Sequence, residues 1–206
     1  MHSVNSFEVW SRRVCILAGL LIASAAQAAG GSPEAIAVDR RIETRFDPVA
    51  GRTLLTGRAA PDLCFSLALP DEWRRTDDGA RAAASDAALT VKLRSAQELR
   101  GLPHADLVSR DAAALQQDYE ELLGRPAQSV SLSSSAGATR WSATWIDANL
   151  PTAPHPMTVE TIIVPLSDEW VLELSPSGIE TREAYNSLAQ DVLARLTVQG
   201  RAGCRD

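Results

Sequence analysis

Two cysteines and two histidines carry the most reactive side chains of this chain after its first 28 residues. Cys64 and Cys204 belong to no C-x-x-C motif, so redox catalysis is not indicated. His104 stands two residues before Asp106, and His155 lies between two prolines. A metal site needs three or four suitably spaced ligands, which neither histidine has nearby in the sequence. We therefore assign no metal, no cofactor and no catalytic residue.

Each histidine also has a plain structural interpretation. Asp106 is placed to cap the first turn of a helix by accepting backbone N–H bonds, with His104 exposed beside it. His155 lies in a proline-rich loop and is either an exposed side chain or part of a surface cleft. Acyl transfer would need a nucleophilic serine, yet the chain has no G-x-S-x-G elbow. A hydrolase using His104 or His155 stays an alternative hypothesis.

Two tryptophans are the best candidates for a binding surface. Trp141 and Trp145 fall on one face of a predicted strand. Large aromatic side chains in this arrangement either fill the core or anchor a partner at an interface. In the second case, Arg140 and His155 would contribute to the polar rim of the site.

The first 28 residues have the layout of a secretory signal. Arg12 and Arg13 precede an apolar run, Val14 to Ala25, and Ala26-Gln27-Ala28 offers an A-x-A cleavage site. The run is short for a retained membrane anchor, which needs ~20 apolar residues. We therefore predict cleavage after about Ala28, a periplasmic or secreted protein, and no stable membrane anchor after cleavage.

Export changes how the cysteines are interpreted. Cleavage would remove Cys15 and leave Cys64 and Cys204, which predicts one disulfide in an oxidising compartment. Two free thiols or an intermolecular link are the alternatives. The formal net charge of the 206-residue chain is −6, and Lys92 is its only lysine. Because a phosphate-backbone binder needs a basic cluster, we expect no nucleic-acid partner.

The periodicity of the sequence predicts an α+β domain over residues 38–206, after a flexible lead-in at 29–37. A mostly antiparallel sheet with two main helices packed on it is expected. The predicted helices cover 106–123, with Val108, Ala112, Leu115, Tyr119 and Leu122 inward, and 180–196, with Tyr185, Leu188, Val192 and Leu196 inward. The predicted strands lie in hairpins at 38–58 and 81–95 and at 63–69, 128–133, 140–146, 157–166 and 170–174.

Two short segments and the order of elements resemble a known family. The segment from Phe65 to Trp73 is similar to the "strand, proline, two residues, tryptophan" opening of PsbP-like and DcrB-like domains. The run Val164 to Leu174 is similar to the strand-turn-strand before the closing helix of that fold. The resemblance covers about residues 62–198 and implies a PsbP-like architecture without a shared catalytic site.

These observations together predict an exported accessory or binding module of the bacterial cell envelope. It would act through protein–protein contacts, and its partner would be another envelope protein. Beside the hydrolase hypothesis, an immunity-type or chaperone-type protein for a specific effector is a further alternative.

Overall fold

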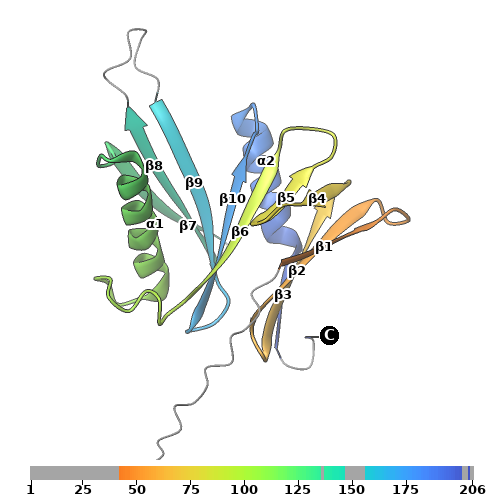
Figure 1. Cartoon of the computed structure of the whole chain (residues 1–206), viewed down its shortest axis with the longest axis horizontal. Helices are drawn as coiled ribbons and strands as arrows, with labels where there is room; N and C mark the ends of the chain where they lie inside the picture. The colour runs from red at the N-terminus through yellow and green to blue at the C-terminus, as the bar shows by residue number, and fades with distance from the viewer. Residues whose placement is uncertain (1–41, 136, 147–155, 201–203, 205–206) are drawn as a thin grey trace, which may run out of the picture. The chain divides into compact units, whose positions relative to one another are not determined.

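The computed structural model describes residues 42–135, 137–146, 156–200 and 204. They belong to one compact unit that spans residues 37–206. Two helices and two antiparallel sheets make up the described part (Figure 1). The α+β class is therefore confirmed, whereas the expectation of one sheet is wrong. The strands divide into a four-stranded and a seven-stranded sheet.

The four-stranded sheet has the order β1-β2-β3-β11. Its strands are β1 (Ile42–Asp47), β2 (Arg52–Ala60), β3 (Leu63–Pro70) and β11 (Leu196–Gly200). The predicted first hairpin is confirmed, since Asp47 Oδ1 accepts hydrogen bonds from the N–H groups of Val49 and Ala50 in the turn. The predicted alternation of the third strand also holds, because Phe65, Leu67 and Leu69 are buried.

A corner at Pro70–Trp73 leads the chain from one sheet into the other. Asp71 adopts a positive φ of 62°, and the indole N–H of Trp73 donates to the carbonyl of Pro70 at 2.8 Å. The buried Thr53 hydroxyl donates to the carbonyl of Asp71 and accepts from the N–H of Trp73. These bonds satisfy the backbone where β3 ends, so the next strand starts in a new direction and joins a second sheet.

The seven-stranded sheet has the order β4-β5-β6-β10-β9-β8-β7. Its strands are β4 (Trp73–Arg75), β5 (Gly79–Ala82), β6 (Ala88–Ser95), β7 (Ser129–Ser135), β8 (Ala138–Ile146), β9 (Pro156–Pro165) and β10 (Trp170–Ser177). The three-residue β4 was not expected from the sequence. Strand β7 extends through Ser134 and Ser135, two residues beyond the predicted end at residue 133.

Helix α1 (Leu107–Leu123) begins and ends where the sequence predicts. The Asp106 carboxylate accepts the N–H of Ser109, and Gly124 closes the helix with a φ of 64°. The helix packs on β8, β9 and β10, and Ala112 and Leu115 are buried (Figure 1). Leu122, expected inward, is instead 76% exposed. Leu123, one residue further along the helix, packs against the core in its place.

Helix α2 (Arg182–Arg195) is shorter than expected at both ends. Thr181 caps its N-terminus by accepting the N–H of Ala184. Leu196 was expected to close the helix, but it starts β11, which pairs with β3. Helix α2 contacts both β3 and β10, and its Val192 side chain is buried between the two sheets in a shared apolar core.

The predicted disulfide joins Cys64 and Cys204, whose Cα atoms are 5.6 Å apart. Because Cys64 lies opposite Gln199 in the β3–β11 pairing, the bridge fastens the chain just after β11. Such a bond indicates an oxidising, extracytoplasmic compartment. Among the described residues, no helix is long and apolar enough to span a bilayer. The predicted signal and lead-in, residues 1–37, lie outside the described residues.

Candidate functional site

The seven-stranded sheet opens between two of its central strands. β9 and β10 pair from Val171↔Pro165 to Leu174↔Ile162, and the pairing then stops. Both strands continue, β9 back to Pro156 along β8 and β10 on to Ser177 along β6. We call this opening the β9–β10 fork, bounded by residues 156–161 on one side and 175–177 on the other.

The sequence of β10 explains why the pairing stops there. In the same register, Thr161 would face Ser175 and Glu160 would face Pro176. The hydroxyls of Thr161 and Ser175 instead share a side-chain hydrogen bond of 2.8 Å at the closed end of the fork. Pro176 has no N–H to offer a strand ladder, and a proline is tolerated where one edge of its strand is free.

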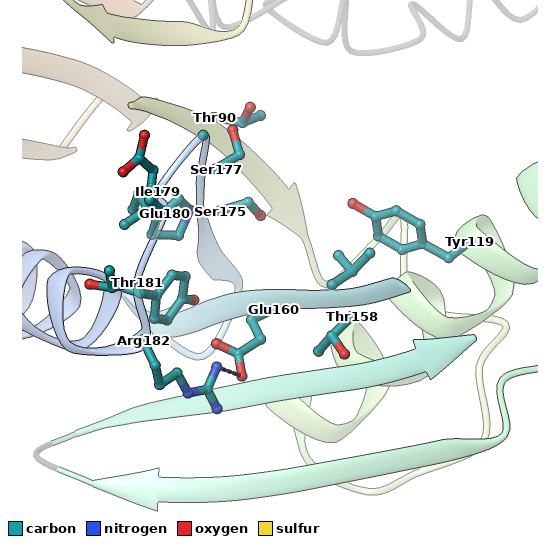
Figure 2. A pocket seen from close by; sticks show the side chains of 14 residues that line it. Thr90, Tyr119, Thr158, Glu160, Ser175, Ser177, Ile179, Glu180, Thr181 and Arg182 are labelled. Atoms are coloured by element: carbon teal, nitrogen blue, oxygen red, sulfur yellow. Dashed lines mark hydrogen bonds and ion pairs between the residues drawn. The ribbon is translucent and has the colours of Figure 1, made fainter. Parts of the chain in front are cut away.

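A pocket of about 570 Å³ occupies the fork. Three residues of each strand line it, Thr158, Val159 and Glu160 from β9 and Ser175, Pro176 and Ser177 from β10. The other walls are Thr90 of β6, Tyr119 of α1, residues 178–181 of the connection to α2, and Arg182 and Tyr185 of α2 (Figure 2). Seven of its fourteen lining residues carry a hydroxyl group, so the walls offer many hydrogen-bonding groups.

Glu160 is the charged group most deeply set in these walls. Its side chain is 6% exposed, and its Oε1 accepts a 2.7 Å hydrogen bond from Nη1 of Arg182 (Figure 2). Its second oxygen, Oε2, is buried without a hydrogen-bond partner among the described residues. A buried carboxylate oxygen without a donor is unfavourable, and the nearby hydroxyl of Tyr185 is a donor that can serve it.

Tyr185 stands beside this carboxylate. Burial, and then the negative charge of Glu160, raise the pKa of the Tyr185 phenol above its usual value. Its hydroxyl is therefore a neutral group at physiological pH; it is buried, and hydrogen bonding toward Glu160 also contributes to the raised pKa. The guanidinium groups of Arg140 and Arg182 lie over its ring, 5.5 and 5.7 Å from the ring centre.

Tyr119 stands at another end of the lining, apart from Thr181 and Arg182 (Figure 2). Its ring stacks on Trp141 and tilts against Trp145, with ring centres 5.8 Å apart in each case. Burial raises the pKa of the Tyr119 phenol, which keeps its hydroxyl protonated. The two tryptophans therefore hold in place one aromatic wall of the pocket.

The structure places the candidate residues from the sequence in different environments, and none of those that it describes lines the pocket. Trp141 and Trp145 are 0% exposed, so they fill the core and present no surface to a partner. Arg140 lies behind the pocket wall, where it contacts Tyr185 and donates a 3.1 Å hydrogen bond to Asn186 Oδ1. His104 is exposed at the approach to α1 and does not line the pocket, and His155 lies outside the described residues.

Sequence reasoning did not identify Glu160, Tyr119, Tyr185 or Arg182 as site residues. The signal that could have indicated the fork is the run Ser175-Pro176-Ser177-Gly178, in which a proline interrupts a strand just before a glycine. Among the described residues, no group of three or more His, Cys, Asp or Glu side chains could hold a metal ion.

No family model, curated protein or solved structure matches this chain. The resemblance to PsbP-like and DcrB-like domains therefore stays a prediction from the sequence.

Proposed function

We propose that this protein is an exported accessory or binding module of the bacterial cell envelope. In this proposal, the β9–β10 fork holds an extended segment of a partner protein. The segment would pair with the free edge of β9, because Pro176 offers no N–H on the β10 side, and it would lie beside β9 as a further strand. Such strand addition is a common mode of peptide recognition, with main-chain bonds for affinity and side-chain pockets for specificity.

The proposal rests on one observation. The pairing of β9 with β10 ends at Ile162 and Leu174, although both strands continue. Beyond this point, no strand of the described chain lies between β9 and β10, and residues 158–160 and 175–177 line a pocket. Backbone groups that lie away from water need partners. An extended peptide supplies N–H and C=O groups along its whole length, which a compact small molecule does not.

The walls of the pocket indicate which peptides would bind best. Glu160 places a carboxylate in the pocket wall, and a lysine or arginine side chain of a peptide would offer it a charged hydrogen-bond donor. Arg182 already pairs with Glu160 through Oε1, so a basic residue of the peptide would share this carboxylate with Arg182. We therefore expect extended segments that carry one basic residue and several small or polar ones.

The disulfide and the layout of the first residues support a place of action outside the cytoplasm. In this proposal, residues 1–28 direct export and are removed, and the mature domain works in the periplasm or outside the cell. A PsbP-like or DcrB-like relationship would be consistent with an accessory role there.

A displayed library of random heptapeptides, panned against the exported protein, tests the proposal. We expect enriched peptides that bind in solution by calorimetry and that contain a basic residue. Glu160→Gln should weaken their binding about tenfold or more, because a hydrogen bond to a charged group is worth ~1.5–3 kcal/mol. Glu180→Gln is the matched control, since Glu180 lines the same pocket but is exposed.

Main-chain pairing is tested separately with the same peptides. N-methylation of alternate residues removes N–H donors without changing side chains. Two forms of each peptide are made, methylated at the odd or at the even positions, and one of the two forms should lose binding. Peptides that bind equally well in both methylated forms would overturn strand addition. A library from which no peptide is enriched would overturn the peptide-binding function itself. Enrichment of many unrelated sequences would favour the chaperone-type alternative.

A further inference from the structure

The outer edge of the seven-stranded sheet is formed by a strand with no charged residue. β7 has the sequence Ser-Val-Ser-Leu-Ser-Ser-Ser, and all seven residues are exposed. It pairs with β8 on one side, and no described strand lies on its other side. Its register with β8 runs without a bulge from Ser129↔Thr144 to Ser135↔Ala138.

The other sheet edges carry features that discourage pairing with another chain. β1 exposes Glu43, Arg45 and Asp47 in alternation. β4 has only three residues, two of which are arginines. β11 has five residues and ends close to the disulfide at Cys204. Charges and short length are usual protections of edge strands, and β7 has neither.

We propose that β7 pairs with β7 of a second copy of this chain, antiparallel and centred on Leu132. The two seven-stranded sheets would then form one continuous sheet across a twofold axis. This register places Leu132 opposite Leu132, Val130 opposite Ser134, and Ser129 opposite Ser135. A twofold contact uses the same patch on both subunits, so the strand must be complementary to itself.

The side chains of β7 meet this requirement. No like charges oppose each other, which is the main penalty in pairing a strand with its own copy. Val130 and Leu132 project on the face of the sheet that carries α1, as their partners Ala143 and Trp141 do. They are 41% and 52% exposed, and the paired copy would cover part of their surface.

A second copy fits this edge better than a charged segment of another protein. The edge offers hydroxyl and aliphatic groups and no charge that would bind a complementary one. One pair of strands covers less surface than a standard stable interface, so a weak dimer that dissociates on dilution is expected.

Sedimentation equilibrium of the exported protein over about a hundredfold range of concentration tests the inference. We expect the wild type to pass from monomer to dimer as concentration rises. Leu132→Lys and Leu132→Glu should each be monomeric throughout, because like charges would face each other across the axis. An equimolar mixture of the two variants should recover the dimer, since opposite charges would then face each other.

Leu122→Lys is the matched control, because Leu122 is an exposed leucine of α1 and not of β7. It should associate as the wild type does. Since Leu132 is half exposed, all variants should keep the wild-type melting temperature, which circular dichroism will verify. A wild type that stays monomeric, or a mixture that fails to recover the dimer, would overturn the inference. No peptide ligand enters this experiment, so its outcome is independent of the proposed function.

Discussion

At the scale of single residues, the most unusual group is a carboxylic acid on the buried face of α1. The side chain of Asp111 is 0% exposed, and neither of its oxygens has a hydrogen-bond partner in the described chain. The Nε atom of Arg94 lies 3.7 Å from Asp111 Oδ1, but the hydrogen bonds of this guanidinium go to Glu173 and Asp118. Burial, and then the charge of Glu173, raise the pKa of Asp111 to about 8.

Asp111 should therefore make the stability of the protein depend on pH. Its pKa rises from 3.8 to about 8 on folding. At pH values between these two, Asp111 is therefore protonated in the folded state and ionised in the unfolded chain. The free energy of unfolding should fall as the pH rises through this range. Asp111→Asn mimics the protonated acid, and it should reduce by roughly half the difference in urea midpoint between about pH 5.5 and about pH 8.5.

The control for this prediction is Asp118→Asn. Asp118 lies on the same helix and binds the same arginine, but its side chain is 52% exposed. It should leave most of the pH dependence in place. If Asp111→Asn shows the wild-type pH dependence, Asp111 is not the group that takes up the proton.

At the scale of elements, the end of β10 determines where the sheet opens. Ser175 reaches Thr161 only through its side chain, Pro176 offers no N–H, and Gly178 turns the chain with a φ of 67°. The turn leads directly to Thr181, which caps α2. Residues 175–178 therefore end the strand, shape one wall of the pocket and lead into the helix.

Gly178 should be among the glycines least tolerant of substitution. A Cβ atom at this position would lie 2.0 Å from the carbonyl oxygen of Asp86, and the backbone is left-handed. Gly137 has a similar φ of 78°, but a Cβ there would meet no atom within 4 Å. Gly137→Ala should cost about 1 kcal/mol from backbone strain alone. Gly178→Ala should cost at least twice as much, as measured by urea unfolding. Equal costs would contradict the close approach of residues 178 and 86.

Much of the element pattern could be predicted from local sequence. Asp106 and Gly124 are ordinary cap residues, and the alternation from Leu63 to Leu69 reports which face of β3 is buried. The division into two sheets could not be predicted in this way. It depends on hydrogen bonds between Thr53 and the Asp71–Trp73 corner, whose bonded residues lie 18 and 20 positions away in the chain.

At the scale of the whole molecule, one covalent bond joins distant parts of the chain. The Cys64–Cys204 disulfide spans 140 residues and fastens the chain after β11 to β3. β11 is an edge strand of five residues, and only Gln199 and Leu196 are half-buried in it. The bond therefore limits the freedom of an otherwise weakly held end.

Replacing both cysteines, Cys64→Ser with Cys204→Ser, should lower the free energy of unfolding by up to ~5 kcal/mol. It should also speed hydrogen exchange in Leu196–Gly200 more than in β9 or β10. Reduced and alkylated wild type is the control and should show the same changes. In the exported form that we propose, the intact mass before and after alkylation should show no free thiol and a chain that begins at about Ala29. Unchanged stability in the double variant would contradict this role of the disulfide.

The sequence by itself determined the α+β class and most strand and helix positions, and it predicted the disulfide that the structure contains. These follow from periodicity, cap residues and the small number of cysteines, all of which can be read from short stretches or simple counts. The tertiary structure alone decided that Trp141 and Trp145 are core and that Glu160, Tyr119 and Tyr185 meet around one pocket. The physical reason is that strand pairing is a contact between distant segments. Where that pairing stops depends on the residue that lies opposite, which no local pattern contains.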